Sequence, residues 1–178
     1  MLVEKITAAL VQIIAEDREK YTQLVADRFR NEVSLQKQIF ESLRYDVLSL
    51  EREKAYDRSR AKCDFWSIDE SGVESWIELK LCPTNYCQEF GDSRKSIAIT
   101  QQIGQVILDC EKLCKIERRH ERKIVLLTYP MPVGEDHPGW RTHATWILEY
   151  ATDISRQHQF LLSRNGTEAA INVYIIDV

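Results

Sequence analysis

One short segment limits the possible folds more than any other part of the chain. Residues 63–68 and 73–81 alternate apolar with polar side chains, and the turn-forming residues Asp69-Glu-Ser-Gly72 lie between them. This pattern is typical of two antiparallel strands joined by a tight turn. A three-residue loop over 70–72, with glycine last in the left-handed conformation, is a common hairpin connection. The sequence therefore predicts a β-hairpin and fixes its register.

The predicted register brings charged side chains together. Counting back from the loop, Trp66 faces Trp76 and Asp64 faces Glu78 across the ladder, where Cβ atoms lie roughly 4.5 to 5.5 Å apart. Alternation along the second strand puts Lys80 on the same face as Glu78. Like charges in opposite positions destabilise a hairpin, so a compensating cation is needed.

Two carboxylates and a lysine suggest a particular chemistry. Mg²⁺ prefers oxygen ligands and usually keeps water ligands while it binds one or two carboxylates and substrate phosphate oxygens. A lysine beside such a site can orient or help deprotonate an attacking water and can stabilise charge in the transition state. The cluster of Asp64, Glu78 and Lys80 therefore predicts metal-assisted phosphodiester hydrolysis.

Periodic apolar residues predict helices before the hairpin. Over 2–30 they recur every three or four positions, which predicts one long helix or two stacked helices. Asn31 can cap a further helix whose inward apolar stripe ends at Leu43. Glu32 lies three residues before Leu35, so it is expected to share that buried stripe.

Shorter patterns complete an α/β or α+β layer with a central mixed sheet of about five strands flanked by helices. The further elements expected are a strand over 47–52 that ends in the charged segment 53–60, a loop over 82–96, a helix over 97–117, a buried strand over 123–128, a helix near 142–159 and a strand over 169–177.

Asp64, thirteen intervening residues and then Glu78-Leu79-Lys80 resemble the active-site motif of the PD-(D/E)xK superfamily, the restriction-endonuclease-like nucleases. The resemblance implies a core of helix, three-stranded meander, helix and strand, which fits residues 31–128. It implies that Asp64 and Glu78 bind Mg²⁺ or Mn²⁺ and that Lys80 positions the nucleophilic water. Cys63 stands where the family often has proline, a loose part of the motif.

The resemblance also extends to residues outside the motif. It implies that Glu32 matches an auxiliary acid that many members carry on the first core helix. It implies that Gln101 or Gln102 could occupy the place of a substrate-binding glutamine on the helix after the lysine. The chain is then one domain, 1–178, with an N-terminal helical extension over 1–30, a nuclease core over 31–128 and a C-terminal helix and strand over 129–178.

The charge distribution favours a local contact with nucleic acid. A formal charge of −4 excludes the basic surface of a non-specific nucleic-acid coat. Cations concentrate in residues 51–62 and 111–123, whereas residues 63–110 hold three cations and eight acids. Arg58 and Arg60 in the first segment are therefore candidate phosphate contacts. By the family resemblance, DNA is favoured over RNA as the partner.

Two alternatives to a nuclease stay open. The same fold could serve as a non-catalytic module that binds nucleic acid or another protein, with a purely structural acidic cluster. The amphipathic N-terminal helix could also form a homodimer surface.

The chain shows no secretory signal and no apolar stretch near the roughly 20 residues of a membrane helix. This predicts a soluble, cytoplasmic protein that makes no membrane contact. Cys82, Cys87, Cys110 and Cys114 suggest zinc as an alternative use of the thiols. Cys110 and Cys114 are nevertheless expected on the apolar stripe of their helix, where cysteine packs as a small hydrophobe.

Overall fold

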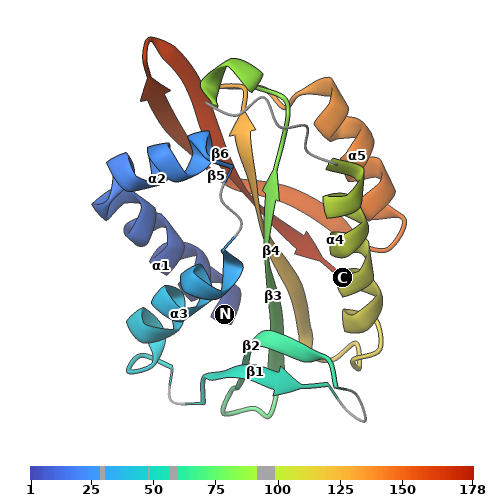
Figure 1. Cartoon of the computed structure of the whole chain (residues 1–178). Coiled ribbons are helices and arrows are strands. Elements are labelled where there is room, and N and C mark those ends of the chain that lie inside the picture. Colours follow the sequence, from blue (N-terminus) through green and yellow to red (C-terminus); the bar gives the residue numbers. More distant parts are fainter. Residues whose placement is uncertain (29–30, 48, 57–59, 92–98) are drawn as a thin grey trace.

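In the described part of the chain, six strands form the centre of the protein: β1 (Glu51–Ala55), β2 (Lys62–Ile68), β3 (Glu74–Pro83), β4 (Glu121–Met131), β5 (Asp153–Arg164) and β6 (Thr167–Asp177). They make one sheet in the order β1-β2-β3-β4-β6-β5 (Figure 1). The pair β3–β4 is parallel and the other pairs are antiparallel. The predicted mixed α/β architecture is confirmed, with six strands in place of about five. The computed structural model describes residues 1–28, 31–47, 49–56, 60–91 and 99–178.

Helices cover both faces of this sheet (Figure 1). On one face lie α1 (Leu2–Glu16), α2 (Arg18–Ala26) and α3 (Glu32–Leu43); on the other lie α4 (Ile99–Leu113) and α5 (Pro138–Leu148). A short 3-10 helix, η1 (Gln88–Phe90), follows β3. Among the described residues, no helix is both long and apolar enough to cross a membrane.

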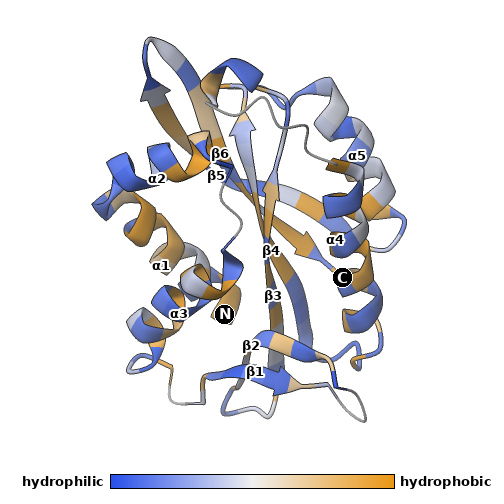
Figure 2. Ribbon diagram, viewed as in Figure 1, coloured by the Kyte–Doolittle hydropathy of each residue, from blue (hydrophilic) through white to orange (hydrophobic). Residues whose placement is uncertain are grey.

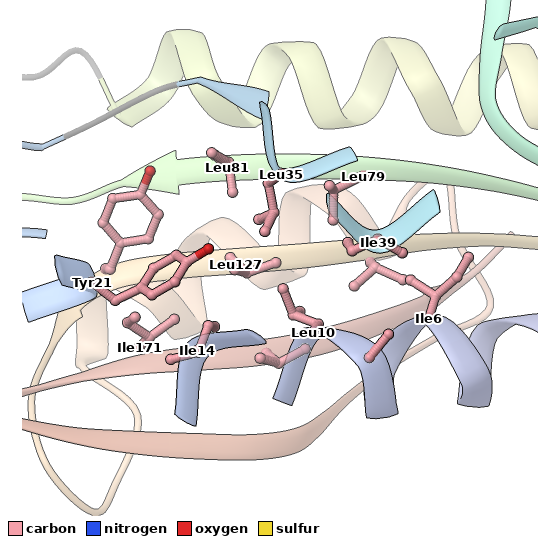
Figure 3. Close-up of a cluster of buried hydrophobic side chains, with 14 of the residues drawn as sticks. Ile6, Leu10, Ile14, Tyr21, Leu35, Ile39, Leu79, Leu81, Leu127 and Ile171 are labelled. Carbon is pink, nitrogen blue, oxygen red and sulfur yellow. The ribbon is translucent and has the colours of Figure 1, made fainter. Parts of the chain in front are cut away.

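The central strand β3 is buried from both sides. Leu79 and Leu81 point toward Ile39 and Leu35 of α3 in the core beneath α1–α3 (Figure 3). Burial of one such side chain contributes roughly 1.5 to 3 kcal/mol. In Figure 2, hydrophobic residues accordingly predominate in α1 and in the middle of the sheet, whereas much of α2 and β1 is hydrophilic.

The opposite face of β3 carries the candidate site. Trp76 and Cys82 belong to the core beneath α4 and α5. Since side chains alternate along a strand, Glu78 and Lys80 are on this same face, as the sequence predicted. They are polar positions inside an otherwise apolar layer.

The N-terminal helices belong to the core. The chain forms two helices, because the backbone departs from helical geometry at Asp17. The apolar stripe of α1, which includes Ile6, Leu10 and Ile14, is fully buried against the sheet (Figure 3). The protein's own core therefore covers the stripe proposed as a dimer surface, and the homodimer stays a prediction.

The hairpin β2–β3 has the predicted register. Ile68 pairs with Glu74 and Trp66 with Trp76. The amide of Asp69 donates to the carbonyl of Val73 at 3.0 Å. The loop glycine, Gly72, has a φ of +78°, the left-handed conformation that the three-residue connection needs.

The strand predicted over 47–52 is wrong in its position. After α3, the amide of Val47 donates to the carbonyl of Leu43 and the amide of Leu50 donates to the carbonyl of Val47, a pattern of turns and not of a strand. The strand begins at Glu51 and continues to Ala55. It therefore includes the first residues of the charged segment 53–60, which was expected to follow the strand. Pairing with β2 outweighs the weak strand propensity of its charged residues.

The helix predicted near 142–159 is also wrong at both ends. It begins at Pro138, where the His137 ring accepts a hydrogen bond from the Gly139 amide at 3.0 Å, and proline suits a first helical turn. It ends at Leu148, and β5 follows. The signal for β5 is Asn165-Gly166, a tight-turn dipeptide with positive φ at both residues, which is typical of a two-residue hairpin.

Two glycines give a matched test of this backbone. A Cβ at either Gly72 or Gly104 would meet nothing within 4 Å. Gly72 is left-handed, whereas Gly104 is inside α4. We expect Gly72→Ala to lower the free energy of unfolding by about 1 kcal/mol and Gly104→Ala to raise it by a similar amount. Urea unfolding measures both; effects of equal sign would contradict this account.

Candidate active site

The site lies at the edge of β3 where β2 stops pairing with it. The β2–β3 ladder extends to Phe65 and Ile77. Beyond it, the amide of Leu79 donates to Oδ2 of Asp64 at 2.8 Å and the amide of Leu81 donates to Oε2 of Glu32 at 3.1 Å. Two carboxylates therefore satisfy amides that a neighbouring strand would otherwise bond, and they bring β2 and α3 to the same edge.

Asp64 and Glu78 form a close acidic pair, as the hairpin register predicted. Glu78 is 3% exposed. In its protonated form its carboxyl group hydrogen-bonds Asp64. Burial, followed by the charges of Asp64 and Asp109, raises the pKa of Glu78 to about 9. Burial also raises the pKa of Asp64. Without a cation the pair holds a proton at neutral pH.

Tyr56 is a member of the site that the sequence did not reveal. Its hydroxyl donates to Oε1 of Glu78 at 2.6 Å, and its ring stacks on Trp76 with centroids 5.3 Å apart. Burial, together with the negative groups around it, raises the pKa of Tyr56, so the phenol stays a donor. It fixes Oε1 of Glu78 beside the acidic pair.

Lys80 lies between two acids from helices on opposite faces of the sheet. Its Nζ is 3.5 Å from Oε2 of Glu32 and 3.3 Å from Oδ2 of Asp109. Burial lowers the pKa of Lys80, but the carboxylates around it, Asp109 foremost, more than offset this and raise it overall. Lys80 is therefore an ammonium at neutral pH, a donor and a positive charge rather than a base.

Glu32 occupies the place that its helix predicted. Asn31 caps α3 by accepting a hydrogen bond from the Ser34 amide at 3.0 Å. Glu32 follows in the first turn, half-buried, and faces β3. Burial raises the pKa of Glu32, although the charge of Lys80 and the Leu81 amide oppose this effect. The four predicted residues Asp64, Glu78, Lys80 and Glu32 are thus brought together.

Asp109 of α4 is the second residue that sequence reasoning missed. It is 2% exposed and also pairs with Lys112 one turn further along. Its position held a signal, because it lies three residues after Val106 and next to Cys110 on the buried stripe. A carboxylate on a buried helix face needs a partner.

The predicted substrate-binding residues are less closely tied to the cluster. Gln101 is exposed and Gln102 is half-buried, both in the first turns of α4. No hydrogen bond joins either glutamine to the carboxylates or to Lys80 in the described part of the chain. Arg60 is exposed between β1 and β2, and Arg58 lies outside the described residues.

The cysteines do not form the alternative zinc centre within the described residues, where no three His, Cys, Asp or Glu side chains are arranged to hold a metal. All five cysteines lie in that part of the chain, and none forms a disulfide. Cys110 is buried as expected. Cys114 is exposed, which corrects its predicted place on the apolar stripe: α4 ends at Leu113.

The residues of the acidic pair fit a magnesium ion in their chemistry. Asp64 and Glu78 offer hard oxygen ligands from adjacent strands, and Mg²⁺ needs only one or two carboxylates when water and phosphate oxygens complete its shell. The proton that Glu78 holds marks an excess of negative charge at this point. A divalent cation would replace that proton.

Comparisons of the chain with known proteins give no family. No family model, curated protein or solved structure matches it. The geometry of the site and the motif itself are therefore the indications of its function.

Proposed function

We propose that this protein is a metal-dependent nuclease with a restriction-endonuclease-like fold, which hydrolyses phosphodiester bonds in DNA. The observation that carries the proposal is the buried Asp64–Glu78 pair, with Lys80 beside it at the open edge of β3. The order of α3, β1–β3, α4 and β4 supports it, since the core of that fold has the same sequence of elements.

Each residue of the cluster has a distinct task in such a reaction. Mg²⁺ or Mn²⁺, held by Asp64 and Glu78, would polarise the phosphate and activate a water molecule. Lys80 is an ammonium, so it donates hydrogen bonds toward the nucleophilic water and stabilises the negative charge that grows at phosphorus. Glu32 holds Lys80 and the edge of β3 in place.

DNA is the substrate that the family resemblance favours. Arg60 and the basic run over 111–123 supply cations for its phosphates. The substrate and the absence of disulfides among the five cysteines support a cytoplasmic location.

Cleavage of plasmid and single-stranded DNA tests the proposal directly. We expect the wild type to cut DNA with Mg²⁺ or Mn²⁺ and to be inactive in EDTA. Asp64→Asn and Glu78→Gln should each lower the rate at least a hundredfold, because each removes a charged metal ligand. Glu70→Gln, an exposed position in the hairpin loop, is the matched control and should keep full activity.

A non-catalytic module of the same fold is the alternative. One observation favours it: Glu78 bonds both Tyr56 and Asp64, so the acidic pair is satisfied without a metal. In that case the wild type would bind DNA without cutting it, and Glu78→Gln would leave binding unchanged. Metal-dependent cleavage that survives in both carboxylate variants would refute the assignment of the site.

A further inference from the structure

A buried carboxylate from α4 completes the surroundings of Lys80. Asp109 is 2% exposed, and its Oδ2 is 3.3 Å from Nζ of Lys80. That oxygen has no hydrogen-bond partner in the described part of the chain. The contact with Lys80 is therefore an ion pair without hydrogen-bond geometry, and it compensates a buried charge that would otherwise destabilise the protein.

The other oxygen of Asp109 bonds a second amine. Nζ of Lys112 contacts Oδ1 of Asp109 across one turn of α4, and the Lys112 side chain is 39% exposed. Lys80, in contrast, is 21% exposed. One carboxylate thus holds an inner ammonium next to Glu78 and an outer ammonium that solvent, or a bound polyanion, can reach.

We propose that Asp109 is a positioning residue of the active site, which holds Lys80 beside the Asp64–Glu78 pair and Lys112 as a contact for a phosphate of the substrate. This inference rests on the proposed nuclease function and adds a residue that the motif does not contain. The helix α4 contributes to the site through Asp109 and Lys112, at positions beyond the two glutamines predicted from the sequence.

The charges around Lys80 support this arrangement. Burial lowers the pKa of Lys80, but four carboxylates more than offset this, in the order Asp109, Glu32, Asp64 and Glu78. An ammonium among so many carboxylates would be drawn to whichever is nearest. Asp109 and Glu32 hold it from opposite sides, which fixes its place on the face of β3 that carries Glu78.

Steady-state cleavage kinetics test the role of Asp109. Asp109→Asn keeps the shape but removes the charge, and we expect kcat to fall tenfold to a hundredfold, as for residues that orient a ligand through another group, while KM changes less than threefold. In a Lys80→Met background the same substitution should cause no further loss, since its effect passes through Lys80. Glu111→Gln, exposed on α4, is the matched control.

Binding of fluorescein-labelled duplex DNA in EDTA tests the role of Lys112 without catalysis. Loss of one phosphate contact should weaken binding threefold to tenfold and reduce the slope of log K against log salt by about one. We expect this for Lys112→Gln. Lys20→Gln, an exposed change on α2 across the sheet, should leave affinity and slope unchanged.

The outcomes separate this inference from the proposed function. If the wild type cuts DNA but Asp109→Asn behaves like Glu111→Gln, or its effect adds fully to that of Lys80→Met, the positioning role is refuted and the nuclease stands. If the wild type binds DNA without cutting it, the nuclease is refuted and the binding measurement alone decides. Equal affinity of Lys112→Gln and Lys20→Gln, or no binding by the wild type, then overturns the inference.

Discussion

Replacing Glu78 by glutamine is expected to stabilise the metal-free protein at alkaline pH. Burial, followed by the charge of Asp64, raises the pKa of Glu78 from 4.5 to about 9. The bound proton therefore contributes to stability below about pH 4.5, and this contribution is lost as the pH rises toward 9. Glutamine resembles the protonated acid at every pH, because it donates to Asp64 and accepts from Tyr56.

Thermal unfolding in EDTA at pH 5 and pH 8.5 measures this effect. We expect Glu78→Gln to be more stable than the wild type at pH 8.5 by a few kcal/mol, roughly 5 to 10 °C in Tm, and the difference to shrink at pH 5. Glu70→Gln should follow the wild type at both values. A Tm of Glu78→Gln below that of the wild type at pH 8.5 would show that ionisation of Glu78 beside Asp64 does not destabilise the fold.

Magnesium should reverse the order of the two proteins. A ligand that binds only the native state raises its stability, and the wild type offers two carboxylates where the variant offers one. Added Mg²⁺ is therefore expected to raise the Tm of the wild type at pH 8.5 and to leave that of Glu78→Gln nearly unchanged. The same substitution would then stabilise the fold and remove the activity, which is typical of a site kept for function.

The acidic pair could be predicted from sequence because a local rule determines it. The loop over 70–72 sets the register of the hairpin, and the register places Asp64 opposite Glu78 without any information on the remaining fold. The inward position of Glu32 could be predicted from the helical spacing of its apolar neighbours. That spacing could not identify the partners of Glu32, since Lys80 and the Leu81 amide are on a strand about fifty residues away.

Asp109 and Tyr56 could not be found in this way. Helical spacing places Asp109 on the buried face of α4, but only the crossover between β3 and β4 decides that this face meets Lys80. Tyr56 follows a strand whose start was predicted too early, so its approach to Glu78 had no basis in the assumed register. Both contacts depend on how distant elements pack.

The strand β5 was missed for a different reason. It lies at the edge of the sheet, and most of its residues are exposed or half-buried, so its apolar pattern is weak. Its pairing with β6 supplies the stability that the pattern does not show. The Asn165-Gly166 turn was the better indicator, because a hairpin turn constrains both strands that flank it.

Lys80→Met is expected to destabilise the protein strongly even in the absence of substrate. The substitution keeps most of the apolar side chain but leaves Asp109, 2% exposed, without the ammonium 3.3 Å away, and Glu32 without its counter-charge. Removal of one partner of a buried ion pair costs about 3 to 5 kcal/mol. Urea unfolding at pH 7 in EDTA should show a loss of this size.

A second substitution, added to Lys80→Met, identifies the cause of that loss of stability. If the negative charge of Asp109, left with Lys112 alone, is responsible, Asp109→Asn in the Lys80→Met background should recover much of the stability, because it removes the charge that Lys80 compensated. Lys115→Met, at an exposed position beyond α4, should change the free energy of unfolding by less than about 0.5 kcal/mol. A double variant no more stable than Lys80→Met would mean that packing around the methylene chain, and not charge, determines the effect.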